Sequence, residues 1–203
     1  VKIFPQLSLK GNFDLRLWTR RGKIAKIQGM KIVFASDVHG SLYAMNDLTE
    51  RIAEEKPDKA IFVGDFCGFG NAEKFRLLVK KITCPIVYVE GNCDHDDILS
   101  SYGLESGRTS HIEILGDRRV FITHGHIYNR SRVPDYLTDG DVFVYGHLHK
   151  PFIIKEKGII FVNDGSMARP REGNKPTYAV LTDEKVYIKD GKYGEILEVF
   201  SLN

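Results

Sequence analysis

The chain has 203 residues and a formal net charge of +2; 42% of its residues are apolar and 28% are charged. These proportions are those of an ordinary folded domain, and they exclude a disordered, fibrous or low-complexity chain. No apolar run approaches the roughly 20 residues that span a bilayer, and no secretory signal pattern opens the sequence. We therefore expect a protein that neither enters a membrane nor is secreted.

Charge is unevenly distributed along the chain. Residues 1–29 carry seven Lys or Arg against one acid, whereas the remaining residues are acidic overall, with 22 basic and 26 acidic side chains. A nucleic-acid-binding domain would present a broad basic face, so we expect no nucleic acid as a stable partner. The cysteines Cys67, Cys84 and Cys93 show no C-x-x-C spacing, which suits a reducing, cytoplasmic location.

Residues 1–29 form a basic N-terminal extension without a clear apolar partner, and we expect the compact domain to occupy residues 30–203. Two interpretations compete for the extension. It is either a basic arm that contacts something or a passive, disordered segment that precedes the native domain. The passive interpretation is favoured because chain ends that are not tied down are commonly disordered. Trp18, the only tryptophan, is the one residue that favours a basic arm with a binding role.

From residue 30 onward, short β-branched and aromatic runs alternate with helical patterns, which indicates an α/β architecture. The apolar run 31–36 is typical of a strand. A helix is expected after the N-cap candidate Ser41, because apolar residues then recur at spacings of three and four until Pro57. A second helix is expected after Asn71. Strands are predicted at 60–63, 86–89, 111–115, 119–123, 142–145, 159–162, 177–182 and 185–188, which two packed sheets flanked by helices would accommodate.

Five of the apolar runs end in the same way. Each delivers a side chain that can bind a metal at or just past its carboxyl end, namely Asp37, Asp65, Asn92, His124 and His147. In open α/β sheets, ligands collect outside the carboxyl ends of the strands, so these five tips are expected to converge on one cleft.

Two of these tips carry a second candidate ligand two residues further on, His39 after Asp37 and His149 after His147. Alternate residues of an extended chain lie on the same side, so both members of each pair can reach one ion. Oxygen and imidazole ligands without thiolates suit Mn²⁺, Fe²⁺, Zn²⁺, Co²⁺ or Ni²⁺ better than a structural zinc site.

Together these residues resemble the calcineurin-like metallophosphoesterases, in particular the small prokaryotic phosphodiesterases related to the retromer scaffold subunit. The family pattern D-x-H, G-D, G-N-x-D, H-G-H and G-H-x-H is met at 37–39, 64–65, 91–94, 124–126 and 146–149. The resemblance implies a four-layer sandwich of two mixed β-sheets flanked by helices. It also implies two divalent metal ions, with Mn²⁺ favoured.

The resemblance further implies how these two ions are divided among the side chains. Asp37, His39 and His149 would bind the first ion, Asn92, His124 and His147 would bind the second, and Asp65 would bridge the two.

By the same resemblance, the activity is hydrolysis of a small phosphate ester by a metal-bridging hydroxide. The Asn92 amide would stabilise the charge that develops on the phosphoryl oxygens. Cys93 stands where many members have a histidine that can protonate the leaving group, and a thiol is a weaker donor at neutral pH. We therefore expect a preference for good leaving groups, although a small thiol without a role is about equally compatible with this position.

Four further residues receive roles by this reasoning. Asp94 and His126 are grouped with Asn92 and Cys93 as catalytic candidates, His126 because it can orient His124 or contact phosphate. Arg169 and Arg171 can bind a substrate phosphate, or they can belong to a solvated loop. Substrate recognition is expected from the loops 94–110 and 129–139.

Two other functions are compatible with parts of this pattern. A non-catalytic protein-interaction scaffold would have a degraded metal site, and retention of all seven ligand candidates argues against it. A phosphomonoesterase or nucleotide phosphatase on the same fold has the same motifs. We favour a phosphodiesterase because a cysteine at position 93 is similar to the pattern of the small prokaryotic group. The sequence does not decide whether the chain also forms a homo-oligomer.

Overall fold

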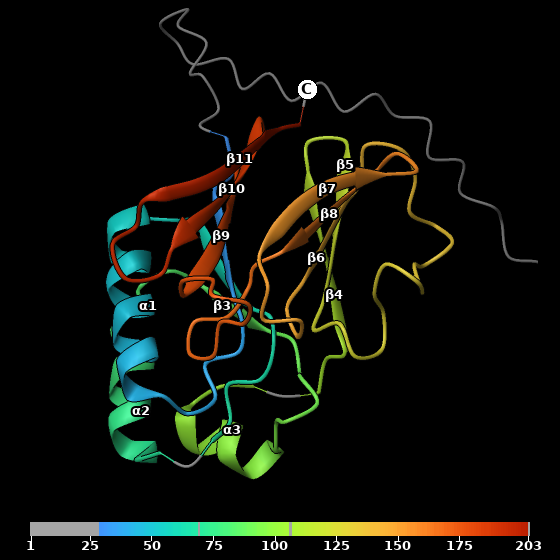
Figure 1. Ribbon diagram of the computed structural model, residues 1–203. Helices are drawn as coiled ribbons and strands as arrows, with labels where there is room; N and C mark the ends of the chain where they lie inside the picture. Colours follow the sequence, from blue (N-terminus) through green and yellow to red (C-terminus); the bar gives the residue numbers. More distant parts are fainter. Residues whose placement is uncertain (1–28, 69, 106, 203) are drawn as a thin grey trace, which may run out of the picture.

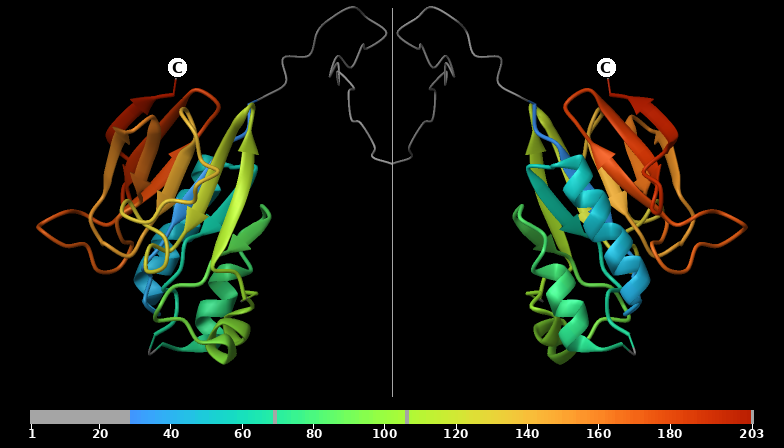
Figure 2. Two further views of the ribbon diagram at one scale, coloured as in Figure 1. Left: turned by 90° about the vertical axis from the view of Figure 1, so that its right-hand side faces the viewer. Right: turned by 90° about the vertical axis from the view of Figure 1, so that its left-hand side faces the viewer.

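A computed structural model of the protein describes residues 29–68, 70–105 and 107–202. Two mixed β-sheets pack face to face, and the helices lie on one side of them (Figures 1 and 2). The order of the six-stranded sheet is β11-β10-β9-β1-β2-β3, and that of the five-stranded sheet is β4-β5-β6-β8-β7. The first 28 residues, on which the expectation of a basic extension rests, lie outside the described residues.

The six-stranded sheet joins three parallel strands to three antiparallel ones. Its strands are β1 (Ile32–Ala35), β2 (Lys59–Phe62), β3 (Ile86–Tyr88), β9 (Thr177–Leu181), β10 (Lys185–Asp190) and β11 (Ile196–Ser201). β1, β2 and β3 are parallel neighbours, so their carboxyl ends meet at one edge of the sheet. β1 is apolar throughout because both of its faces are buried, with Val33 toward the helices and Phe34 toward the other sheet.

The helices cover the outer face of this sheet. They are α1 (Leu42–Glu55), α2 (Ala72–Val79) and α3 (Asp96–Tyr102). α1 begins as the sequence predicts, because the Ser41 hydroxyl accepts a hydrogen bond from the Ala44 N–H group at 3.2 Å. It ends with Lys56 in the left-handed conformation, just before Pro57. Asn71 caps α2 in the same manner, with its side-chain oxygen 2.9 Å from the Lys74 nitrogen.

The five-stranded sheet supplies the other wall of the core. Its strands are β4 (Ser110–Leu115), β5 (Arg118–Thr123), β6 (Val142–Tyr145), β7 (Phe152–Glu156) and β8 (Ile159–Asn163). β5, β6 and β8 are parallel. On the outer face of this sheet, the fourth layer of the expected sandwich is a loop and not a helix. Apolar side chains of that loop, such as Tyr128, Val133 and Leu137, bury the aromatic face.

The predicted α/β architecture with two mixed sheets and helices is confirmed. The sequence did not indicate α3, β7 or β11, and α3 occupies part of the segment 94–110 that was expected to be a loop. α3 is short and begins with two aspartates, so it lacks a long apolar period. No helix among the described residues is long and apolar enough to cross a membrane.

Candidate metal centre

The five predicted strand ends converge at one edge of the molecule. Backbone hydrogen bonds continue the strand pairing into the loops: the Asp37 N–H group donates to the Gly64 carbonyl at 3.0 Å, and the Gly146 N–H group donates to the His124 carbonyl at 3.0 Å. The link between the two sheets is also direct, because the His147 N–H group donates to Oδ2 of Asp37 at 3.0 Å. The loops of both sheets are therefore held against one another.

Asp37, His39 and His149 form the first group of candidate ligands. Oδ1 of Asp37 lies 3.1 Å from Nε2 of His149 and 3.6 Å from Nε2 of His39. The two imidazole rings stack with their centroids 5.3 Å apart. One ligand atom from each of the three residues lies within 4.8 Å of the other two, so the three side chains can reach one cation.

Asp65 and His124 form a second group that also contains Asp37. Oδ1 of Asp65 lies 3.4 Å from Nε2 of His124. The ring of His147 lies beside this group, with its centroid 5.1 Å from that of His124. Asn92 lines the same cleft as Asp65 and His147, and the cleft has a volume of about 390 Å³. The structure thus brings the seven predicted ligands to one place.

Unpartnered buried atoms support a cation at this place. Oδ1 of Asp37, Nε2 of His39 and Nε2 of His124 are buried and have no hydrogen-bond partner. Buried polar atoms without partners are costly, so their presence in the two groups of candidate ligands suits cations that would coordinate them. The residues present therefore fit the divalent cations that the sequence motifs imply.

Hydrogen bonds on the far side of two imidazoles fix which nitrogen faces the centre. Nδ1 of His124 lies 2.7 Å from the Val63 carbonyl oxygen, and Nδ1 of His149 lies 2.7 Å from the Arg169 carbonyl oxygen. A carbonyl oxygen only accepts, so each Nδ1 carries a hydrogen, and in the neutral ring Nε2 has the lone pair that can coordinate a cation. Such contacts orient histidine ligands in metal sites.

The backbone at the centre is strained. Asp37, His39, Asp65, His147 and His149 all have positive φ values, between 47° and 66°. Residues other than glycine adopt this left-handed region at a cost of about 1–3 kcal/mol each, and such residues cluster at functional sites. His39, Asp65, His147 and His149 of this set line the cleft.

Gly64 allows the two loops to approach closely. It has a φ of +91°, and a Cβ atom at this position would lie 2.6 Å from Nδ1 of His124 and 2.7 Å from the Gly91 nitrogen. Any side chain there would push the His124 imidazole and the Asn92 loop apart. The glycine that precedes Asp65 is therefore required by packing as well as by conformation.

The carboxylates and imidazoles of the centre perturb one another. Burial by itself would raise the pKa of Asp37, but the close imidazoles of His149 and His39 hold it well below its ordinary value. Burial would lower the pKa of His124, yet its interactions with Asp65 and Asp37 raise it to about 8. The pKa of His147 is lowered by burial and by the neighbouring His124. The site therefore keeps its carboxylates ionised and attracts positive charge.

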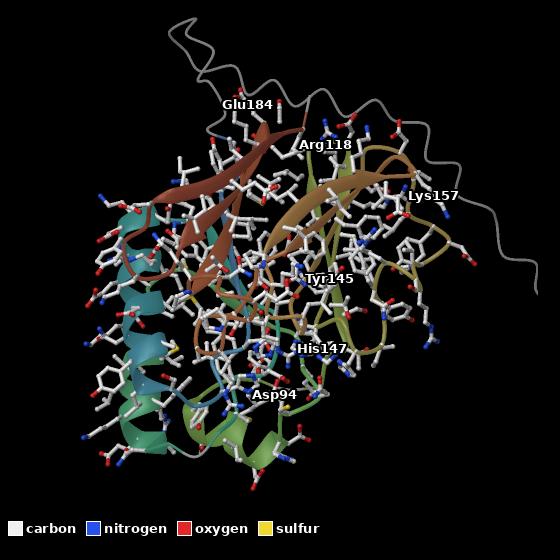
Figure 3. The ribbon with its side chains drawn as sticks, in the orientation of Figure 1. Asp94, Arg118, Tyr145, His147, Lys157 and Glu184 are labelled. Carbon is white, nitrogen blue, oxygen red and sulfur yellow. The ribbon has the colours of Figure 1, made fainter. Side chains whose placement is uncertain are left out.

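Asp94 joins two of the ligand loops. Its Oδ2 accepts hydrogen bonds from the Asp65 and Gly91 N–H groups and from the Tyr88 hydroxyl, at 2.9, 2.8 and 2.6 Å. Its Oδ1 accepts from the N–H groups of the next two residues, Phe66 and Cys67, at 2.9 and 3.0 Å. In Figure 3, Asp94 and His147 lie near one another in the region of the strand ends. One carboxylate thereby fixes the Asp65 loop against the Asn92 loop.

A second hydrogen-bond network, through Ser36 and Asp164, supports Asp37. The Ser36 hydroxyl lies 2.6 Å from Oδ2 of Asp37 and 2.7 Å from Oδ1 of Asp164. Asp164 is fully buried, and burial together with the charge of Asp37 raises its pKa well above the ordinary value. The turn 163–166 buttresses the centre further, because the Ser166 hydroxyl donates to the Asp37 carbonyl at 3.0 Å.

The remaining predicted residues lie around the rim. Cys93 is exposed; its Sγ belongs to a group of candidate ligands with His39 and Asp65, and burial and Asp65 raise its pKa to about 11. His126 is exposed, and its ring centroid lies 5.6 Å from that of His124.

Arg169 and Arg171 line the cleft beside His149, as their predicted role in substrate binding requires. The similarity of the turn 163–166 to a turn of the family suggests that it supports the cluster, but the hydrogen bonds of Asp94 and the contact between Ser36 and Asp164 join positions far apart in the chain and have no sequence signal.

Fold and site together define a metallophosphoesterase. The profile of the calcineurin-like phosphoesterase superfamily domain matches residues 30–185, and the chain belongs to this family. It is a metal-dependent phosphoric ester hydrolase.

Named relatives agree with this assignment. The chain is 32% identical over 167 residues to phosphodiesterase YfcE of Escherichia coli strain K12, a match that covers 76% of this chain and 89% of the relative. It is 28% identical over 160 residues to phosphodiesterase MJ0936 of Methanocaldococcus jannaschii, covering 77% and 95%.

Solved structures share the fold. The structure of YfcE, a phosphoesterase from E. coli, aligns with a TM-score of 0.76 and 27% identity over 86% of this chain and 100% of that chain. Vacuolar protein sorting 29 from Cryptosporidium parvum aligns with a TM-score of 0.57 and 18% identity, over 86% and 97%, which shows the fold alone. The predicted resemblance to the small prokaryotic phosphodiesterases is confirmed, and the likeness to vacuolar protein sorting 29 is one of fold.

Proposed function

We propose that the chain is a phosphodiesterase that uses two divalent cations. The observation that carries this proposal is that three buried ligand atoms without partners, on Asp37, His39 and His124, belong to the candidate ligand groups at the strand ends. The ligand division remains the one that the motifs imply: Asp37, His39 and His149 hold one ion, Asn92, His124 and His147 hold the other, and Asp65 serves both. Mn²⁺ is the favoured ion, because the cluster is rich in carboxylate and imidazole ligands.

When bound, the cations supply Lewis-acid activation of water and charge stabilisation at the phosphoryl group. The residues of the chain supply orientation. Hydrogen bonds to the Val63 and Arg169 carbonyls fix the rings of His124 and His149, and Asp94 and Ser36 fix the loops that carry the two aspartates. The Asn92 amide, exposed at the mouth of the cleft, is placed to donate a hydrogen bond to a phosphoryl oxygen.

Cys93 bears on how the leaving group of the substrate is protonated. Cys93 lines the cleft next to Asn92, where an imidazole would serve as a proton donor. A thiol with a pKa near 11 donates poorly at neutral pH, so substrates with good leaving groups are favoured. The names of YfcE and MJ0936 as phosphodiesterases support diester hydrolysis. We assign His126 a supporting contact with phosphate or with His124.

Add-back of metal ions tests this proposal. Protein stripped with a chelator is supplied with Mn²⁺, Ni²⁺, Co²⁺, Zn²⁺ or Mg²⁺, and hydrolysis of bis-p-nitrophenyl phosphate is compared with that of p-nitrophenyl phosphate. We expect Mn²⁺ to restore activity and the diester to be the better substrate. A better monoester would indicate a phosphomonoesterase, and activity on neither with any ion would indicate a protein-interaction scaffold.

The cellular setting completes the proposal. The three cysteines are free thiols, and one of them lies at the rim of the metal cleft, so a reducing compartment such as the cytoplasm suits the protein. Its expected partner is a small phosphate ester, with no stable nucleic-acid or membrane partner.

A further inference from the structure

The loop after β8 places two arginines at the metal cleft. Arg169 and Arg171 line the cleft together with His39, His147 and His149. Both arginines are exposed, and the ion pairs of the described residues do not include either guanidinium group; the nearby Glu172 is paired with Lys150 at 2.6 Å. Two positive charges therefore face the cleft without an acidic partner in the described part of the chain.

The loop is fastened to the centre. The Arg169 N–H group donates to the Ser166 hydroxyl at 2.8 Å, the Arg169 carbonyl accepts from Nδ1 of His149 at 2.7 Å, and the Arg171 N–H group donates to the His149 carbonyl at 2.9 Å. Nε2 of His149 points the other way, toward Asp37. The backbone of the two arginines is thus held against His149, while their side chains belong to residues that line the cleft.

The two arginines provide the chemistry of a phosphate-binding site. Guanidinium groups bind phosphate oxygens through paired hydrogen bonds, and two of them match a dianionic group. A volume of about 390 Å³ lies near the lower end of the range for small-ligand sites, about 300–1,000 Å³. A second phosphate bound by these arginines would share the cleft with the first, and one bridging oxygen is the shortest link between the two.

We infer that the substrate is a diphosphate diester, in which Arg169 and Arg171 bind the phosphate that departs. This inference rests on the proposed phosphodiesterase activity. Water adds to one phosphorus, the bond from that phosphorus to the bridging oxygen breaks, and its electron pair stays on the departing oxygen. One diphosphate diester and one water give two phosphate monoesters, which retain the two protons of the water or release them to solvent.

Two substrates separate this inference from the proposed activity. Bis-p-nitrophenyl phosphate has no second phosphate, whereas P1,P2-di(adenosine-5′) diphosphate is a diphosphate diester. The values of kcat and KM are measured for both with the Mn²⁺-loaded wild type, the double variant R169Q/R171Q and the control R130Q. Arg130 is an exposed arginine paired with Glu156 away from the cleft.

We expect the double variant to lose roughly 10- to 100-fold in kcat/KM on the diphosphate, mainly through KM, and less than threefold on bis-p-nitrophenyl phosphate. The control should match the wild type on both. Calorimetry with methylene diphosphonate and chelator-stripped protein gives a readout without metal, and the double variant should bind this probe at least tenfold more weakly.

Equal losses on both substrates, or unchanged binding of the diphosphonate, would overturn the inference. Hydrolysis of bis-p-nitrophenyl phosphate without hydrolysis of the diphosphate would overturn it and leave the phosphodiesterase proposal intact. Failure on both substrates with every ion would overturn the two proposals together.

Discussion

The substitution D94N isolates the contribution of one carboxylate to the architecture of the site. The carboxylate accepts hydrogen bonds from four backbone N–H groups and the Tyr88 hydroxyl, at 2.6–3.0 Å. Asparagine has nearly the same shape, but its Nδ2 can only donate. Whichever way the amide is turned, it faces at least two N–H groups with a donor. The substitution therefore removes two accepted bonds and adds no bulk.

The magnitude follows from those two bonds. A hydrogen bond between a backbone N–H group and a charged acceptor contributes about 1.5 kcal/mol at the lower end of its range, which applies because Asp94 is only partly buried. D94N should lower the free energy of unfolding by about 3 kcal/mol. Because the Asp65 and Asn92 loops also lose their common acceptor, affinity for divalent cations should fall at least tenfold.

Urea denaturation in the presence of a chelator measures the stability change without interference from metal binding. The control is D97N, which removes an exposed carboxylate from the first turn of α3 and should cost about 0.5 kcal/mol. If D94N and D97N differed by less than about 1 kcal/mol, the hydrogen-bond network would not have the role assigned to it. An unchanged metal affinity in D94N would refute the link to the centre.

Three further predictions concern other parts of the molecule. C93H should raise turnover on diesters with poor leaving groups more than on those with good ones; equal gains across leaving groups would contradict the proton-donor argument. Burial would raise the pKa of Glu55, but its contacts with Lys189 and other partners lower it. The stability that this carboxylate contributes is therefore present above about pH 4.5 and is lost as pH falls through the folded pKa. Urea melts of E55Q between pH 3 and 7 should lack that loss, and a curve parallel to wild type would argue otherwise. G64A should abolish Mn²⁺ binding in calorimetry, whereas G173A, with a positive φ but open space around it, should retain it.

The sequence predicts the central elements well because they are buried on both faces. β1 and β6 read as uninterrupted apolar runs, and the carboxyl end of each leads directly to a ligand. β11 lies at a sheet edge, where four consecutive residues from Ile196 are exposed and burial imposes no pattern. α3 has only seven residues, too few for a helical period to stand out. The predicted elements are therefore those whose environment dictates their composition.

The ligands of the site are predictable for a related reason, because each follows its own strand by one to four residues. The groups that hold the ligands are not. Ser36 meets Asp164 across 128 positions, and Asp94 meets Asp65 across 29. Such contacts depend on how the two sheets and their loops pack, which no local pattern encodes. The positive φ values of the ligands are equally hidden, since aspartate and histidine show no preference strong enough to reveal them.

The most direct test of a two-cation centre is a calorimetric titration of Mn²⁺ into chelator-stripped protein. We predict two ions per chain for the wild type. Because Asp65 is assigned to both ions, D65A should bind at most one, and weakly. Absence of binding to the wild type, or two ions bound with unchanged affinity by D65A, would contradict the assignment of this cluster as a dinuclear metal centre.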